Sequence, residues 1–249
     1  MTHIVAVSGY NVSVIVIAVM GFVLFIGLRR KYAVYIAIGS IVFFIALIGF
    51  PSSGVRAGIM GIMVLIASVY GRVTHAYGAL IFAGALMLVY NPLILRYDVG
   101  FQLSFLATLG IISTYPIFER YFVNKRFSFG IIEMILLTLS AQIFVVPIIA
   151  LQFHTFTPLS LVVNMLVLPI IPCVMLLVFL LIIFYYVYMP IALMCGWMAY
   201  YLLAYEIAVI SFFAQLSWSS VLIENIYPVW IVLYYCVVSI CLIRLHKNL

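Results

Sequence analysis

Polar side chains that could act on a ligand lie in a segment otherwise suited to lipid. Within residues 98–110, Asp98 and Gln102 share one helical face, and Ser104 and Thr108 follow on a neighbouring face. Buried polar groups at membrane depth need partners or water. This pattern therefore predicts either close packing against another helix or the lining of an aqueous path.

Residues for catalysis or metal binding are scarce in this chain. The sequence has five acidic residues, and its four histidines lie at positions 3, 75, 154 and 246. It contains no HExxH motif, no metal-spaced cluster and no phosphate-binding glycine loop. We therefore expect no catalytic residues, no metal or other cofactor, no ATP hydrolysis and no enzyme activity. A membrane-embedded acid pair, Asp98 with Glu133, is the remaining catalytic alternative.

The composition indicates that the elements carrying these side chains lie in a membrane. Mean hydropathy is +1.41, and only 6% of residues are charged. So few charges could not solvate the surface of a soluble domain, so lipid is the solvent for most of the chain. We expect one all-α polytopic membrane domain over residues 1–249. The first apolar stretch should remain as a membrane helix, because no basic region precedes it.

Apolar stretches of about 20 residues predict about nine membrane segments. They lie at roughly 4–28, 32–50, 57–70, 77–90, 99–118, 129–152, 159–186, 191–214 and 227–243. The third and fourth are short, which indicates tilt, burial or a re-entrant pair. In the seventh, Pro169 and Pro172 each remove a backbone donor, so we predict a broken helix there. Such a break marks a substrate path or is an ordinary kink.

The distribution of basic residues predicts the orientation of these segments. With the N-terminus outside, the inside loops hold nine of the eleven Lys and Arg residues, and the outside loops hold Arg56 and Arg96. Positive charge favours the cytoplasmic side, so we predict the N-terminus outside and the C-terminus inside. Topology thus accounts for most of the net charge of +6.

Four stretches, in order and separation, resemble the membrane domain of the ComEC-type competence family. They are His3-x-x-Ala-Val-Ser-Gly9, Ser53-Gly-Val-Arg56-Ala57, the segment 98–110, and Pro158-Leu-Ser-Leu-x-x-Asn164-x-x-x-x-Pro169-x-x-Pro172. The resemblance covers about residues 1–215. It implies a channel that conducts one strand of incoming DNA across the cytoplasmic membrane during natural transformation.

The resemblance implies that the polar side chains are candidate lining residues of a DNA path. The candidates are Ser8, Asn11, Arg56, Asp98, Gln102, Ser104, Thr108, Gln142 and Asn164, with Pro169 and Pro172 as the helix break. Arg56 is the strongest candidate to meet a phosphate, because we place it outside, between two membrane segments. A snorkelling interfacial arginine is the alternative. The family usually has histidine where this chain has Asn11, which argues against a titratable group there.

Longer relatives carry an OB-type domain and a metallo-β-lactamase-like domain, which do not fit within 249 residues. A minimal family member, one half of a split gene and an incomplete reading frame all agree with this length. The expected partners are single-stranded DNA, membrane lipid, separate OB-type or DNA-receptor and nuclease proteins, and a cytoplasmic ATP-driven motor. Assembly into a homo-oligomer is a further option. Two other functions fit the sequence: a small-solute secondary transporter, and a non-conducting scaffold for a DNA-processing subunit.

Overall fold

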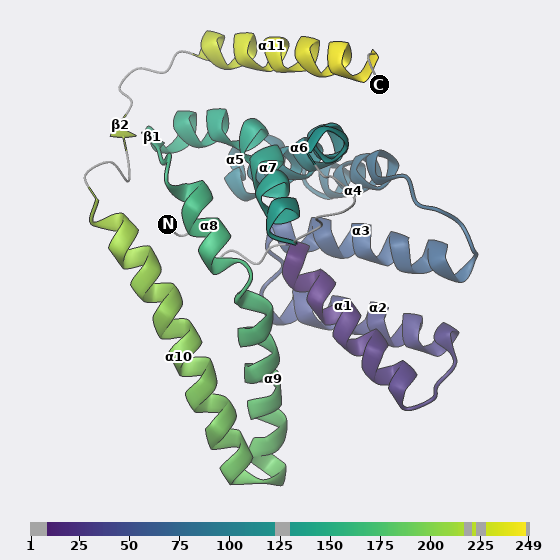
Figure 1. Ribbon diagram of the computed structural model, residues 1–249. Coiled ribbons are helices and arrows are strands. Elements are labelled where there is room, and N and C mark those ends of the chain that lie inside the picture. The colour runs from purple at the N-terminus through teal and green to yellow at the C-terminus, as the bar shows by residue number, and fades with distance from the viewer. Residues whose placement is uncertain (1–8, 123–129, 217–220, 223–227, 248–249) are drawn as a thin grey trace. The chain divides into compact units, whose positions relative to one another are not determined.

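The computed structural model describes residues 9–122, 130–216, 221–222 and 228–247. Apart from two short strands, the regular structure of these residues is helical (Figure 1). The internal contacts divide the chain into two compact units, Met1–Ser113 (unit 1) and Thr114–Leu249 (unit 2).

Unit 1 is built around a packed group of helices near the N-terminus. Its elements are α1 (Gly9–Phe25), α2 (Arg30–Leu47), α3 (Ser52–Val69), α4 (Ala76–Tyr90), α5 (Ile94–Tyr97) and the first part of α6 (Val99–Phe122). Helices α1, α2 and α3 pack against one another, and α4 packs against α3. The buried side chains between them are apolar: Val12, Val34, Ala37, Ile41, Ile45, Ala57 and Leu65.

Helices α1 and α2 each end at a glycine in the left-handed region. Gly27 has φ +83° and Gly49 has φ +79°, values that glycine adopts without a side-chain clash. The Gly27 N–H donates to the Leu24 carbonyl at 3.0 Å. The next N–H, of Leu28, donates to the Val23 carbonyl at 3.3 Å, which completes a Schellman end. The chain can therefore turn back within a few residues, and consecutive helices lie side by side.

Helix α3 approaches α2 closely at Gly58. A Cβ atom at this position would overlap the Ile45 side chain and would lie 3.2 Å from Cγ2 of Ile41. Both isoleucines are buried. The missing side chain at Gly58 therefore allows the two helices to approach within ordinary van der Waals distance.

Unit 2 continues α6 and adds a second group of helices. Its other elements are α7 (Gly130–Phe153), β1 (Thr155–Phe156), α8 (Ser160–Val167), α9 (Ile171–Val187), α10 (Met189–Ala214), β2 (Val221–Leu222) and α11 (Pro228–Lys247). The two strands pair antiparallel, with Thr155 opposite Leu222. Helix α10 runs alongside α9 and contacts α8 (Figure 1).

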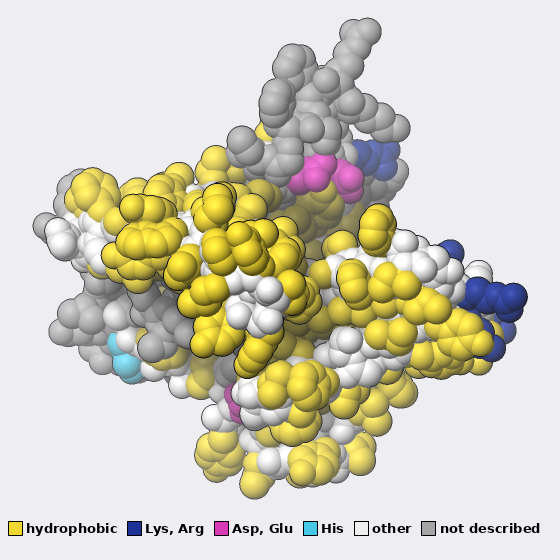
Figure 2. Space-filling model, turned by 90° about the horizontal axis from the view of Figure 1, so that it is seen from below, with side chains coloured by type: hydrophobic (Ala, Val, Ile, Leu, Met, Phe, Trp, Pro, Cys, Tyr) yellow, Lys and Arg dark blue, Asp and Glu magenta, His cyan; other side chains and the backbone are white. Residues whose placement is uncertain are grey.

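The helices identify the protein as a multi-pass membrane protein. Five of the described helices, α2, α3, α6, α7 and α10, are long and apolar enough to cross a membrane. Helices α8 and α9 form a further span, bent by 40°, if they are taken together, and α1, α4 and α11 contain shorter apolar helical stretches. Hydrophobic side chains cover most of the face shown in Figure 2. The predicted helical membrane class is confirmed.

Each of the nine predicted apolar stretches contains a helix, but one boundary differs in a way that matters. Helix α3 begins at Ser52, where we predicted a start at residue 57. Pro51 lies at the N-cap with φ −62° and ψ 142°. The Pro51 carbonyl accepts the Val55 N–H at 2.9 Å, so the helix begins directly after the proline. Arg56 therefore belongs to α3, so the prediction that it lies in a loop was wrong, while its location on the outside remains a prediction.

Candidate functional site

The guanidinium of Arg56 is buried within unit 1 and is held by hydroxyl groups of α6. Only 8% of the residue is exposed. Its Nε–H donates to the Ser104 hydroxyl at 2.6 Å, and Nη1 donates to the Thr108 hydroxyl. Nη1 also lies 3.7 Å from the sulfur of Met60. Ser104 and Thr108, predicted either to pack against another helix or to line an aqueous path, thus contact an arginine from α3.

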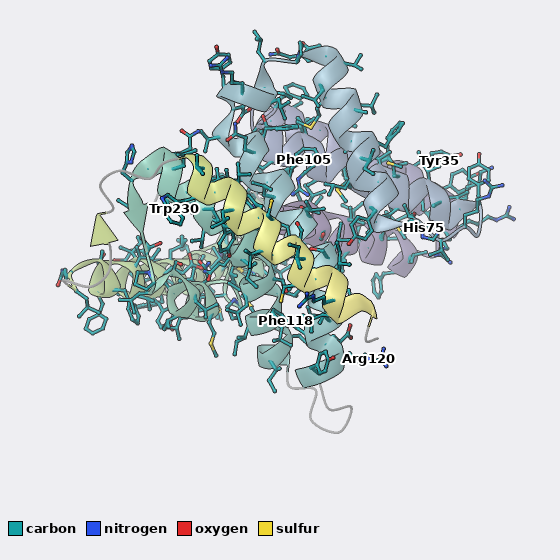
Figure 3. All side chains as sticks on the ribbon, turned by 90° about the horizontal axis from the view of Figure 1, so that it is seen from above. Tyr35, His75, Phe105, Phe118, Arg120 and Trp230 are labelled. Carbon is teal, nitrogen blue, oxygen red and sulfur yellow. The ribbon has the colours of Figure 1, made fainter. Side chains whose placement is uncertain are left out.

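An aromatic ring and the start of α1 complete the surroundings of the guanidinium. The Arg56 Cζ lies 5.9 Å from the ring centroid of Phe105, within the range of a cation–π contact. Phe105, labelled in Figure 3, stacks on Phe101 with ring centroids 4.3 Å apart. A Cβ atom at Gly9 would lie 3.5 Å from the Arg56 Nη2. The guanidinium is therefore enclosed by parts of three helices.

The contacts of Arg56 leave its positive charge without a counter-charge. Its hydrogen-bond acceptors are two hydroxyls and the Met60 sulfur, and no carboxylate pairs with it among the described residues. A guanidinium stays protonated near neutral pH. The site can therefore attract an anion, while the two hydroxyls fix the orientation of the donor groups.

Asp98 connects the starts of α3 and α6. Its Oδ1 accepts the Phe101 backbone N–H at 3.0 Å, which caps the first turn of α6. Its Oδ2 accepts a hydrogen bond from the Ser52 hydroxyl, in the first turn of α3. Gln102 donates from Nε2 to the carbonyls of Leu95 and Arg96, at 2.9 and 3.2 Å. Both polar groups therefore hold the connection between α5 and α6, and their lining of a path remains a prediction.

In unit 2 the candidate residues lie on α7 and on the bent pair α8–α9. Gln142 of α7 donates from Nε2 to the Ser160 hydroxyl of α8 at 3.1 Å. Helix α8 ends at Val167 and α9 begins at Ile171. Pro169 lies in the gap between them and Pro172 in the first turn of α9, so the predicted break is confirmed.

Sequence reasoning missed two tyrosines of α11 that reach α7. The Tyr234 hydroxyl donates to the Ile143 carbonyl at 3.0 Å, and the Tyr235 hydroxyl donates to the Phe144 carbonyl at 2.6 Å. A signal was present, because Pro147 withholds the N–H that would otherwise bond the Ile143 carbonyl. The sequence does not indicate which distant donor replaces that N–H.

The comparisons with known proteins agree with the motifs. A family model described as "Competence protein" matches residues 1–248. The chain belongs to the competence protein family. Over 167 residues it is 27% identical to ComE operon protein 3 of Bacillus subtilis (strain 168). The aligned region covers 67% of this chain and 21% of that protein. The matched part is thus about a fifth of the relative's length. No solved structure matches at a significant level.

The remaining candidate residues of this competence-family chain are placed as follows. Asn11 lies in the first turn of α1, and its Oδ1 is buried with no hydrogen-bond partner among the described residues. Asn164 lies on α8, about one turn before the break. Ser8 lies outside the described residues. The described part of the chain contains no group of three or more His, Cys, Asp or Glu residues that could hold a metal ion.

Proposed function

We propose that this competence-family domain forms a passage for single-stranded DNA across the cytoplasmic membrane during DNA uptake. Family membership supports the role in uptake, and the chemistry of Arg56 supports the nature of the cargo. The single observation that carries the proposal is a buried arginine whose polar partners are neutral.

The location of Arg56 argues for a use of its charge. A charged residue within a membrane helix is costly, so such residues almost always face the bundle interior or a water-filled cavity, and Arg56 lies in the second turn of α3. The Ser104 and Thr108 hydroxyls orient the guanidinium but do not neutralise it. A strand in a pore needs compensation of its phosphates, which a positive group close to its path supplies.

The proposed topology has nine membrane crossings, with the N-terminus outside and the C-terminus inside. Two contacts agree with its number of crossings, and the orientation rests on the distribution of basic residues. The Ser52–Asp98 hydrogen bond joins the starts of α3 and α6, which this topology places on the outer side. The β1–β2 pair joins the segments that follow α7 and α10, which it also places outside. Two points that touch on the same side of a membrane must be separated by an even number of crossings. The proposed topology places an even number of crossings between the points in both pairs.

The polar residues described above are the proposed lining of the path. In unit 1, Ser104 and Thr108 accept hydrogen bonds from Arg56. In unit 2, Gln142 contacts the start of α8, and Asn164 lies on α8 before the break. Together they are Ser8, Asn11, Arg56, Asp98, Gln102, Ser104, Thr108, Gln142 and Asn164. Interrupted helices are tolerated in membranes where they are buried or line water, which suits the α8–α9 bend to such a path.

The proposed domain acts as a conduit and depends on other proteins for energy and DNA processing. The sequence has no phosphate-binding glycine loop, so an ATP-driven motor on the cytoplasmic side would pull the strand. We assign DNA capture and strand degradation to separate OB-type or receptor and nuclease proteins, and none of these reactions to residues 1–249. A homo-oligomer is compatible with the same arrangement.

Reconstitution tests this proposal directly. Purified protein in liposomes should admit fluorescent single-stranded oligonucleotides when a single-strand-binding protein is trapped inside. Duplexes of the same length should be excluded. Folded protein that admits neither a single strand nor a duplex, at a verified density in the vesicles, would refute a DNA passage.

A small-solute transporter is the second candidate, because the α8–α9 bend has the form of a binding site between half-helices. Replacing Asn164 with leucine separates the possibilities. A DNA passage should lose oligonucleotide entry, and a transporter should lose solute uptake only. A non-conducting scaffold should keep its binding to a DNA-processing partner in the same variant.

A further inference from the structure

Helix α7 carries a proline in its interior, and this residue leaves a carbonyl without its helical donor. Pro147 is buried and lies within the continuous helix Gly130–Phe153. Because proline has no N–H, the Ile143 carbonyl, four residues earlier, cannot make its usual hydrogen bond. An unsatisfied backbone group at membrane depth costs several kcal/mol, so another donor must replace the missing N–H.

Helix α11 provides that donor. The Tyr234 hydroxyl bonds the Ile143 carbonyl at 3.0 Å across 91 positions of the sequence. The adjacent Tyr235 hydroxyl bonds the next carbonyl, of Phe144, at 2.6 Å. The rings of Phe144 and Tyr235 also lie near each other, with centroids 6.3 Å apart. Two successive carbonyls of α7 are thus held from one neighbouring helix.

The other side chains of α11 do not fix its position on α7, so the two hydroxyls are important for this packing. Its less exposed side chains follow one stripe at helical spacing: Ile231, Tyr235, Val238, Leu242 and Leu245. The other face is open, as at Trp230, which is 65% exposed (Figure 3). A single apolar stripe can slide or rotate with little change in the area that it buries. The two directional hydrogen bonds therefore determine the register of α11 on α7.

The same turn of α7 carries a candidate lining residue. Gln142 immediately precedes Ile143, and its side chain reaches the Ser160 hydroxyl of α8 at 3.1 Å. Ser160 is the first residue of α8, the helix that ends at the break. Fixing the carbonyls of residues 143 and 144 therefore fixes the backbone from which Gln142 holds the start of the broken span.

We propose that Tyr234 and Tyr235 are positioning residues for the broken span: through the carbonyls of Ile143 and Phe144 they hold Gln142 on Ser160. The importance of that span rests on the proposed function, but the positioning itself is measurable without DNA. In this arrangement α11 is a brace that holds α7 at the turn before Pro147, and loss of the hydroxyls loosens α8.

Thiol labelling of the full chain in liposomes tests the brace. The four cysteines are replaced with alanine, and Asn164→Cys places a reporter on α8, about one turn after Ser160. We expect Y234F/Y235F to change the rate of labelling by a charged, water-soluble methanethiosulfonate reagent several-fold. Gln142→Leu should change it in the same direction, because both variants release the start of α8. Tyr186→Phe is the matched control, since Tyr186 is 84% exposed on α9.

The outcomes separate this proposal from the proposed function. Matching changes in Y234F/Y235F and Gln142→Leu, with no change in Tyr186→Phe, support the brace even if the protein admits no DNA. A rate unchanged in Y234F/Y235F, or changed equally in Tyr186→Phe, overturns it even if DNA passes. Phenylalanine keeps the ring packing, so these results report on the hydroxyls and not on a general loss of fold.

Discussion

The Nε–H of Arg56 donates to the Ser104 hydroxyl at 2.6 Å, across 48 positions of the sequence. The bond joins a membrane helix that contains a charge to one that contains hydroxyls. It gives the guanidinium a fixed direction while leaving its charge available. Substitutions at position 56 can therefore separate the effect of the charge from that of the geometry.

We expect Arg56→Gln to slow passage of single-stranded oligonucleotides by about tenfold or more, because charge-assisted hydrogen bonds contribute about 1.5–3 kcal/mol. The dependence of passage on salt should also weaken, by about 0.7 in the log–log slope when one phosphate is no longer neutralised. The rate for Arg56→Lys should fall between those of the wild type and Arg56→Gln, since lysine keeps the charge but lacks the planar guanidinium. Initial rates at several salt concentrations measure both effects.

Arg96 provides the matched control for this series. Its side chain is exposed and lies over the ring of Tyr97, with Cζ 5.6 Å from the centroid. Arg96→Gln removes the same charge without removing a buried one. Equal salt slopes for wild type and Arg56→Gln would contradict a phosphate contact at Arg56.

Asp98 should matter for stability, because it caps α6 and accepts the Ser52 hydroxyl. We expect Asp98→Ala to lower the free energy of unfolding by about 1–2 kcal/mol, the range for loss of an N-cap. Asp98→Asn should cost less, since its remaining oxygen can still accept the Phe101 N–H. Unfolding in mixed detergent micelles measures the difference. Ser52→Ala should lower the free energy of unfolding more than Ser40→Ala, because the Ser40 hydroxyl bonds only a carbonyl of its own helix. The reverse order would argue against the interhelical bond between Ser52 and Asp98.

Gly58 should tolerate alanine only when α2 makes room for it. We expect Gly58→Ala to lower the free energy of unfolding by about 1–3 kcal/mol, the usual range for overpacking. Ile45→Val removes the methyl group that the new Cβ would overlap, so the double variant should recover part of this loss. Gly39→Ala is the control, because a Cβ there meets nothing within 4 Å. Additive losses in the double variant would show that the two side chains do not meet.

Pro147 and Tyr234 should show coupled effects. Pro147→Ala restores an N–H that can bond the Ile143 carbonyl, so the Tyr234 hydroxyl then competes for an acceptor that is already satisfied. Tyr234→Phe should lower the free energy of unfolding by about 0.5–1.5 kcal/mol in the wild type, the net value of one hydrogen bond. It should have a smaller effect beside Pro147→Ala. The same loss in both backgrounds would mean that the hydroxyl does not replace the missing helical donor.

The sequence by itself determined the membrane class, the approximate helices and the break near Pro169. These features depend on neighbours along the chain: apolar runs must close their own backbone hydrogen bonds in lipid, and a proline acts on the carbonyl one turn earlier. The short motifs also led to the family. Helical spacing also placed Ser104 and Thr108 on one face, whereas their contact with α3 came only from the structure.

The partners of the polar side chains were decided only by the tertiary structure. Sequence reasoning placed Arg56 outside, between two membrane segments, but the residue lies in α3 and hydroxyls 48 and 52 positions away accept its hydrogen bonds. It also could not assign Tyr234 to Ile143, although Pro147 showed that a donor was needed. Local chemistry states which group lacks a partner, whereas the packing of distant helices selects the group that fills the gap.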